Sequence, residues 1–487
     1  MVLFKWRKRL SRWDQELVFA SLGKEKLRLR EAYEGIAILG GTGSGKTTCS
    51  GFAILCGLLR HAFGALILIN KPDEVDRIRR LVKSLNREED LCVFDEEHGS
   101  GFNFIDYLSN LSTTGMGGIQ QLVYIFEELT EMQERVSNAV QSRGDEQFWK
   151  HAMRRQLTMC MTLLKMATGQ ITVSHLIEIL RDAPQTVEEA NSEAWVNTSV
   201  VCDLLKIAEA NCATDAERFD FAEVKNYFTH DLPRLSSKTR ATIETGVLNG
   251  LQLFSSGTLK RLFCEKTTIT PDDIIREGKI VVLNLPVKQM FGLGIVGQTI
   301  FKTCFQMRVE QRRPDEDRPC VVWIDEAQQF LNMRDQLFAA TARSSKVANV
   351  WLTQNLSNIV VAMGGGDVGK ASADSLMGLA MTKIFHSNSD NTTNQFASDL
   401  IGRRRIRMRS MSVTPEKRIP FQILPQQSNV NVSYSEQFEY IVPPDTFTKL
   451  VKAGYPHGYA EAIVFQAGRI FPSTNEPFTR VAFKQGF

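Results

Sequence analysis

Short runs of apolar residues recur along the 487-residue chain, and most are separated by segments in which apolar positions repeat every three to four residues. The runs are typical of buried strands and the intervening segments of amphipathic helices. Strands that are apolar throughout and alternate with helices indicate a parallel sheet covered on both faces. The pattern therefore predicts an α/β fold with a mainly parallel central sheet. The predicted strands are Gly35–Leu39, Ala65–Ile69, Leu91–Phe94, Ile280–Leu285, Cys320–Ile324, Val347–Thr353, Thr382–His386 and Tyr459–Phe465.

The alternation stops between about Asp106 and Thr270. In this interval the periodicity is helical, for example over Gln147–Met166 and Val173–Leu180. We therefore expect an all-α domain inserted into the sheet domain. The predicted boundaries are a basic, amphipathic N-terminal arm over 1–34, the first part of the sheet domain over 35–105, the inserted domain over 106–270, and the second part of the sheet domain, with a β-rich C-terminal region, over 271–487.

The charges nearly balance, with 58 Lys and Arg against 55 Asp and Glu and a formal net charge of +3. A protein that coats nucleic acid by charge alone carries a much stronger positive field, so any contact with DNA must be local. Five arginines in seven residues are the candidates for contact with DNA phosphates or for a subunit interface, and a solvated loop is the alternative. They are Arg403, Arg404, Arg405, Arg407 and Arg409.

The cellular location is predicted from the cysteines and the apolar segments. Nine cysteines are scattered and never form a CxxC pair, which favours a reducing compartment. The most membrane-like segment, Gly51–Ile69, carries Arg60 and His61 at its centre, where charge is costly in lipid. We therefore expect a cytoplasmic protein with no integral membrane segment. The cationic and aromatic residues 1–13 either lie on the surface of the inner membrane or on a partner, or form a helix packed on the sheet domain.

The first predicted strand of the sheet domain leads directly into a sequence that matches GxxxxGK[ST] and opens a helix. Such glycines let backbone N–H groups converge on phosphate oxygens, while Lys46 neutralises the outer phosphates of ATP and Thr47 offers a hydroxyl to Mg²⁺. The alternative is a glycine-rich turn without a ligand, but the strand before it and the helix after it favour a phosphate cradle. The candidate nucleotide-binding residues are Gly40, Gly41, Thr42, Gly43, Ser44, Gly45, Lys46, Thr47 and Thr48.

Hydrolysis also requires a metal-holding acid and a group that activates water. The strand Cys320–Ile324 is followed by Asp325 and Glu326. At the carboxyl edge of the sheet, Asp325 can hold Mg²⁺ and Glu326 can polarise the attacking water. A helix-capping role for the aspartate is the alternative. The histidines have no partners at metal-ligand spacing, so Mg²⁺ bound with ATP is the only metal we expect.

Two further polar residues are candidates for catalysis. Gln354 ends the strand Val347–Thr353, where a side-chain amide can reach the γ-phosphate, although a solvent-facing glutamine is the alternative. Arg343 lies near the end of a predicted helix, Met333–Ser344. There it either stabilises the helix dipole or acts as an arginine finger in the nucleotide site of a neighbouring subunit.

Seven sequences occur in a characteristic order: GGTGSGKTT (Gly40–Thr48), INKPDE (Ile69–Glu74), FNFIDYL (Phe102–Leu108), QFW (Gln147–Trp149), VVWIDEAQQF (Val321–Phe330), ARSSKVANVWLTQ (Ala342–Gln354) and NSDNTTNQFASDLIG (Asn388–Gly402). In order and spacing they resemble the TraG/TraD-type coupling ATPases of conjugation and type IV secretion, in the HerA/FtsK superfamily of hexameric DNA pumps. The likeness extends from about Gly35 to the C-terminus. It implies a RecA-like motor with an all-α domain inserted between the two nucleotide motifs, and ATP-driven movement of DNA through a ring.

The resemblance assigns roles to several residues. Lys46 and Thr47 fall on the family's phosphate-binding loop, and Asp325 and Glu326 on its metal-binding and water-activating acids. Gln354 falls on its sensor glutamine. The family's proposed trans-acting arginine corresponds to Arg343, while Asn388 and Asp390 match a late motif whose role does not follow from side-chain chemistry.

The sequence departs from the family pattern in two places. Coupling proteins of this type usually begin with transmembrane helices, whereas about 34 residues without a span precede the first predicted strand of the sheet domain, which puts docking to a secretion channel in doubt. The segment after the second strand reads Asn70-Lys71-Pro72, where the family more often has Asp before Lys. The expected partners are DNA and further copies of the chain, and a relaxosome, a secretion channel and a nuclease are candidate partners. The alternative function is a nucleotide-switched assembly ATPase that works with a nuclease or defence partner and does not pump DNA.

Overall fold

The computed structural model describes residues 13–111, 115–137, 146–313, 316, 318–414 and 429–486. Residues 1–12, which hold half of the cationic and aromatic side chains of the predicted arm, lie outside the described residues. The chain forms two compact units. Unit 1 comprises Met1–His61, Asp325–Arg343 and Ala348–Phe487, and unit 2 comprises Ala62–Ile324 and Ser344–Val347.

Unit 1 contains five strands of the central sheet, in the order β13, β12, β9, β3, β8. β3 is parallel to β8 and to β9, whereas β12 is antiparallel to β9 and to β13. Every residue of β3, β8 and β9 is buried, as expected for strands covered on both faces. The bounds are β3 (Ile36–Leu39), β8 (Val347–Thr353), β9 (Thr382–His386), β12 (Tyr459–Gln466) and β13 (Phe478–Lys484).

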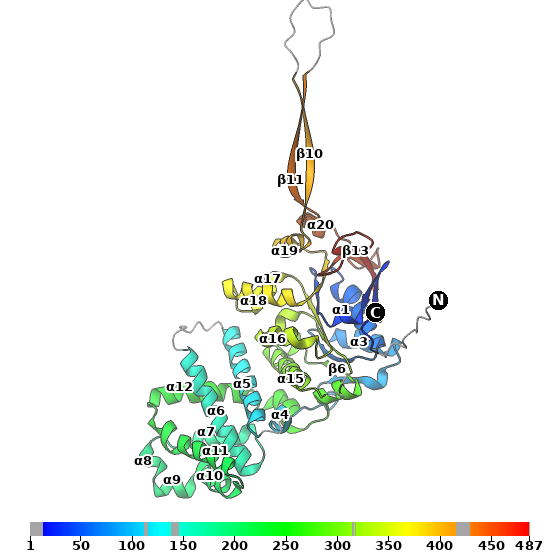
Figure 1. Cartoon of the computed structure of the whole chain (residues 1–487). Coiled ribbons are helices and arrows are strands. Elements are labelled where there is room, and N and C mark those ends of the chain that lie inside the picture. Colours follow the sequence, from blue (N-terminus) through cyan, green and yellow to red (C-terminus); the bar gives the residue numbers. More distant parts are fainter. Residues whose placement is uncertain are drawn as a thin grey trace, which may run out of the picture. The chain divides into compact units, whose positions relative to one another are not determined.

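Two antiparallel hairpins and several helices complete unit 1. The hairpin of β1 (Val18–Leu22) and β2 (Glu25–Arg28) lies in the segment that the sequence analysis assigns to the N-terminal arm. The long hairpin of β10 (Arg403–Thr414) and β11 (Asn429–Tyr440) follows α19 and runs away from it as a two-stranded ribbon (Figure 1). The helices are α1 (Leu29–Ala32), α2 (Phe52–Arg60), α16 (Met333–Ala342), α17 (Leu356–Ala362), α18 (Gly366–Leu379), α19 (Asn391–Ile401) and α20 (Pro444–Thr448).

Unit 2 contains four strands, in the order β7, β4, β6, β5, all parallel. β4, β6 and β7 are buried at every position. The bounds of the strands are β4 (Gly64–Leu68), β5 (Leu91–Phe94), β6 (Ile280–Leu283) and β7 (Cys320–Ile324). The helices between them are α3 (Asp73–Ser84) before β5, and α14 (Val287–Met290) and α15 (Gly292–Glu310) before β7.

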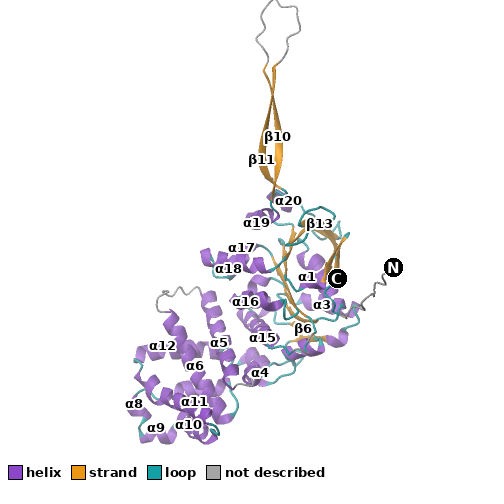
Figure 2. Cartoon of the chain, in the orientation of Figure 1, coloured by secondary structure: helices purple, strands orange, loops and turns teal. Residues whose placement is uncertain are grey.

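Between β5 and β6 the described secondary-structure elements are all helices, as Figure 2 shows. Six consecutive helices, α7 to α12, each begin after a Ser or Thr whose hydroxyl accepts a hydrogen bond from the backbone N–H three residues on. Such caps contribute about 1 kcal/mol each, which explains why so many short helices start at defined positions. The bounds are α4 (Phe104–Leu111), α5 (Gly115–Ser137), α6 (Glu146–Thr168), α7 (Val173–Asp182), α8 (Val187–Ala190), α9 (Glu193–Thr198), α10 (Val200–Asn211), α11 (Asp215–Asn226), α12 (Ser237–Gln252) and α13 (Gly257–Lys260).

The predicted α/β fold is confirmed, with a mainly parallel central sheet of nine strands and a helical insertion. All eight predicted strands occur within two residues of their expected bounds. The domain boundaries proposed from the sequence stay a prediction. Among the described residues, none of the helices combines the length and the apolar character that crossing a membrane requires.

Candidate nucleotide-binding and catalytic site

The parallel strands of unit 1 bring three loops to one edge of the sheet. In the register, Leu39 of β3 lies opposite Thr353 of β8 and Phe385 of β9, so these strands end together. The loop after β3 is tied to both neighbours, because the backbone N–H of Gly40 donates to the Thr353 carbonyl over 3.2 Å and that of Gly41 to the Ser387 carbonyl over 3.0 Å. Residues that follow the three strands therefore meet at this edge.

The phosphate-binding loop predicted from the sequence lies at this edge and leads through a π-helical turn, Lys46–Gly51, into α2. Gly45 has a φ of 90°, and a Cβ atom there would lie 2.7 Å from the Cβ of Ala460, so only glycine fits. The Ser44 hydroxyl is buried and has no hydrogen-bond partner among the described residues. A buried hydroxyl without a partner is costly. The loop therefore fits a ligand with acceptor oxygens, such as a phosphate group.

Lys46 and Glu326 form a buried ion pair, with 3.1 Å between Lys46 Nζ and Glu326 Oε1. Burial raises the pKa of Glu326, but the Lys46 charge and hydrogen bonds from Gln328, Lys46 and Gln354 outweigh it, so this pKa lies below its ordinary value. Glu326 is therefore an ionised carboxylate at neutral pH and can accept a proton. It also adopts a left-handed backbone conformation with a φ of 46°, a strain that is concentrated at functional sites.

Thr47 and Asp325 meet beside this pair. The Thr47 hydroxyl lies 3.3 Å from both carboxylate oxygens of Asp325. A hydroxyl and a carboxylate are oxygen ligands of the type that Mg²⁺ prefers, and Mg²⁺ in nucleotide sites completes its shell with water and phosphate oxygens. No group of three or more His, Cys, Asp or Glu side chains in the described part of the chain could hold a metal ion. These two residues therefore fit a magnesium ion that is held jointly with a nucleotide.

The Glu326 carboxylate is oriented by two glutamines. Gln354 Nε2 lies 3.3 Å from both of its oxygens, and Gln328 Nε2 donates to Oε2 over 2.7 Å. Thr353 in turn donates to the Gln328 side-chain oxygen over 2.9 Å. The structure thus places Gln354, a predicted sensor, next to the predicted water-activating acid. The sequence analysis missed Gln328, although it lies within the quoted motif VVWIDEAQQF.

The structure shows which groups Asn388 and Asp390 contact, which could not be derived from the sequence. Asn388 Nδ2 donates to the Gln354 backbone carbonyl over 2.8 Å, and Asn388 Oδ1 accepts from the Asp390 N–H over 3.0 Å. Asp390 is the N-cap of α19, since its side chain accepts from the Thr393 N–H over 2.9 Å. Asn388 therefore fixes the backbone that carries the Gln354 side chain, and Asp390 joins this loop to α19.

His386 contacts the π-helical turn that follows the phosphate-binding loop. Its Nε2 lies 2.7 Å from the Ser50 hydroxyl, and its Nδ1 lies 3.1 Å from the Glu461 backbone carbonyl on β12. Burial lowers the pKa of His386 to about 4, so the imidazole is neutral at physiological pH. The histidine is buried, and it connects the turn after Lys46 with β12.

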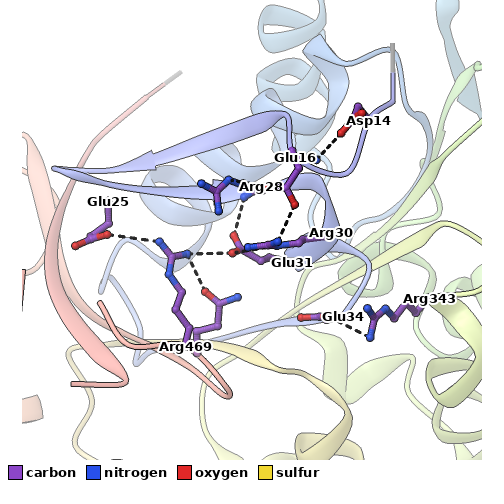
Figure 3. Close-up of polar contacts among 10 residues, drawn as sticks. Asp14, Glu16, Glu25, Arg28, Arg30, Glu31, Glu34, Arg343 and Arg469 are labelled. Carbon is purple, nitrogen blue, oxygen red and sulfur yellow. Dashed lines mark hydrogen bonds and ion pairs between the residues drawn. The ribbon is translucent and has the colours of Figure 1, made fainter. Parts of the chain in front are cut away.

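Arg343 does not lie with these residues. It follows α16, and its Nη1 is 3.3 Å from Glu34 Oε1 (Figure 3). Glu34 precedes β3 whereas Lys46 follows it, and a strand advances by about 3.3 Å per residue. Arg343 and Lys46 therefore lie at opposite ends of β3. The Arg343 side chain is 68% exposed, so its guanidinium group is accessible to another molecule.

The arginines between Arg403 and Arg409 also lie outside the site. All five are on β10, and all five are exposed. The alternative of a solvated loop is therefore wrong in its secondary structure, because this segment is a strand of a hairpin.

The fold is a P-loop ATPase fold, with a mainly parallel sheet and a helical insertion. Residues 319–452 match the family model described as the TraM recognition site of TraD and TraG. This confirms the predicted resemblance to TraG/TraD-type coupling ATPases in the part of the chain that carries Asp325, Glu326 and Gln354. None of the curated proteins matches the chain.

Solved structures of the conjugative coupling protein TrwB share the fold over nearly the whole chain. An unbound form of bacterial TrwBΔN70 superposes with a TM-score of 0.60 at 13% identity, covering 97% of this chain and 89% of that chain. The plasmid coupling protein TrwB in complex with ADP and Mg²⁺ gives a TM-score of 0.59 at 13% identity, and its complex with the non-hydrolysable ATP analogue ADPNP gives 0.58 at 12% identity. Both cover 96% of this chain and 89% of those chains.

Proposed function

We propose that this chain is an oligomeric ATPase that hydrolyses Mg·ATP at the interfaces between its subunits and uses the energy to move DNA. The observation that carries the proposal is a set of contacts between five polar residues at one edge of the sheet. Glu326 lies 3.1 Å from Lys46 and 3.3 Å from Gln354, and its neighbour Asp325 lies 3.3 Å from Thr47. The TrwB complexes with ADP and Mg²⁺ and with ADPNP support the choice of nucleotide and metal.

Each residue of the site has a defined task in this reaction. Lys46 exchanges its partner Glu326 for the outer phosphates, which frees the carboxylate to accept a proton from the attacking water. Gln354 contacts the same carboxylate and so orients it toward the γ-phosphate. Thr47 and Asp325 hold Mg²⁺, which neutralises phosphate charge when it is bound. Glu326, which accepts the proton, and Lys46, which binds the phosphates, are thus adjacent before the nucleotide binds.

The position of Arg343 supports an oligomer. Its own phosphate-binding loop lies beyond the other end of β3, so this arginine can act on phosphates only in another subunit. It borders a pocket of about 970 Å³ with five further cationic side chains. Arg469 is paired with the buried Glu25 and Glu31 (Figure 3), and Arg28 and Arg30 are paired with Glu16. These five are Lys24, Lys26, Arg28, Arg30 and Arg469. We propose that the nucleotide of the next subunit in a hexameric ring faces this pocket.

DNA as the substrate is supported by the resemblance to conjugative coupling proteins and by the match of residues 319–452. The test compares ATP turnover of the full chain without polymer, with single-stranded DNA and with duplex DNA, at low salt and together with particle mass. We expect turnover to rise several-fold with DNA and the mass to correspond to a ring, and Lys46→Ala should abolish nucleotide binding. A nucleotide-switched assembly ATPase would instead change its mass with ATP, ignore DNA and fail to displace a triplex strand from a duplex.

Asn388→Ala should lower kcat by about tenfold with little change in KM. The variant loses the hydrogen bond to the Gln354 carbonyl and leaves that carbonyl and the Asp390 N–H without their partner, which costs about 1–3 kcal/mol of stability for each buried group. Steady-state kinetics and thermal unfolding measure both effects. As a control, Asn388→Asp keeps the acceptor for Asp390 but not the donor to Gln354, so it should restore stability more than kcat. Equal recovery of both would show that Asn388 acts on folding alone.

A further inference from the structure

The ribbon of β10 and β11 has two chemically different faces. Residues directly opposite each other in an antiparallel pair point to the same face, and the register pairs Arg403 with Tyr440 and Arg409 with Tyr434. One face, which we name the arginine-aromatic face, carries Arg403, Arg405, Arg407, Arg409 and Met411 of β10 with Tyr440, Phe438, Glu436, Tyr434 and Val432 of β11. The other face carries Arg404, Ile406, Met408, Ser410 and Ser412 with Glu439, Gln437, Ser435 and Ser433. Four of the five arginines thus share a face with the three aromatic rings.

Two of the three aromatic rings of this face are open to solvent. Phe438 is 69% exposed and Tyr434 is 56% exposed. A two-stranded ribbon has no third strand or helix to cover its faces, and such ribbons are marginally stable in isolation. Exposed apolar side chains gathered on one surface indicate a binding site. The chain therefore presents these rings to another molecule.

The arginines of this face are incompletely neutralised. Arg405 pairs with Glu436 over 2.7 Å, and the Arg407 guanidinium lies 4.6 Å from the centre of the Tyr434 ring. Neither Arg407 nor Arg409 has an ion-pair partner among the described residues. Alternate residues of a strand are about 6.8 Å apart, so the face presents a regular row of positive charge. A row of cations beside flat rings matches a chain of phosphates that carries stacked bases.

We propose that the arginine-aromatic face binds single-stranded DNA, with guanidinium groups on the phosphates and with Tyr434 and Phe438 stacked on bases. A single strand is favoured over a duplex because its bases can unstack from one another and stack on aromatic side chains. The inference rests on the proposed function and names the form of DNA and the surface that holds it. A partner protein with an acidic surface is the competing occupant, since the hairpin lies within residues 319–452.

The root of the ribbon is anchored and is therefore left unchanged in the test. The Tyr440 hydroxyl donates to Asp399 over 2.8 Å and accepts from Gln395 over 2.5 Å, and both of these residues lie on α19. The Arg403 guanidinium lies 4.3 Å from the centre of the Tyr440 ring. Changes at these two positions would alter the attachment of the ribbon as well as its surface.

The test measures binding of fluorescent oligothymidylate and of a duplex of equal length to the full chain by anisotropy at several salt concentrations. Tyr434→Ala and Phe438→Ala should each weaken single-strand binding about tenfold, within the contribution of one stacked base. Arg407→Gln with Arg409→Gln should lower the slope of log affinity against log salt by about 1.4, or about 0.7 for each lost phosphate contact. On the opposite face, Met408→Ala should change affinity less than twofold, and Arg404→Gln should change the slope less than half as much as Arg407→Gln.

Each outcome supports or overturns the inference. If the ring variants bind single strands as the parent does while DNA still raises ATP turnover, the inference is wrong and the proposed function stands. Duplex binding that depends on the arginines but not on the rings overturns the choice of a single strand. Loss of a protein partner without loss of DNA binding assigns the face to the competing occupant. A parent chain that hydrolyses ATP but binds neither form of DNA contradicts the proposed function itself.

Discussion

Arg343→Ala should reduce ATP turnover by about a thousandfold or more and leave ATP affinity nearly unchanged. An arginine that reaches the phosphates from a neighbouring subunit contributes about three to five orders of magnitude to kcat, because it stabilises charge that develops only in the transition state. The lost ion pair with Glu34 is mostly exposed, with Arg343 68% exposed, so folding stability should change by less than about 1 kcal/mol. Steady-state turnover and binding of a fluorescent ATP analogue measure the two effects.

Two controls separate a catalytic Arg343 from a structural one. Glu34→Gln removes the same ion pair but keeps the arginine, so it should retain turnover; equal losses in Glu34→Gln and Arg343→Ala would assign the pair a structural role. Mixing Arg343→Ala with Lys46→Ala places an intact arginine next to an intact phosphate-binding loop in some rings. Partial recovery of turnover is expected, and no recovery at any ratio would contradict action between subunits.

Glu326→Gln should lower turnover by at least about a hundredfold while ATP binding stays equal or tightens. A general base contributes about 10²–10⁴ to the rate, and glutamine cannot accept the proton. Binding should not suffer, because the substitution removes the carboxylate that lies 3.1 Å from Lys46 and competes with phosphate for that cation. Single-turnover hydrolysis and nucleotide affinity test the prediction. Parental turnover in this variant would show that another group activates the water.

The sequence was sufficient to predict the sheet and to single out most of the polar residues that the structure brings together at its edge. Strands such as Val347–Thr353 are rich in apolar residues because they are buried on both faces, and the polar residues Asp325 and Gln354 come directly after two such strands. Such information is local in the sequence, so it can be read without coordinates.

Other features depend on contacts between distant segments, which no local pattern reports. The contact of Asn388 with the Gln354 carbonyl and the role of His386 beneath the phosphate-binding loop are of this kind. The sequence predicted a β-rich C-terminal region but not the two paired strands β10 and β11, because most of their side chains are exposed and no covered face imposes an alternation of apolar and polar residues.

The close approach of Gly45 to Ala460 affects how the protein is made. The glycine loop begins at residue 40, yet Gly45 lies against the Ala460 methyl group of β12, and the Glu461 carbonyl of the same strand contacts His386. A ribosome adds about 5–20 residues per second, so more than 400 further residues take at least about 20 seconds to appear after the loop has emerged. During that time a nascent chain lacks the β12 residues that lie against the glycine loop and His386.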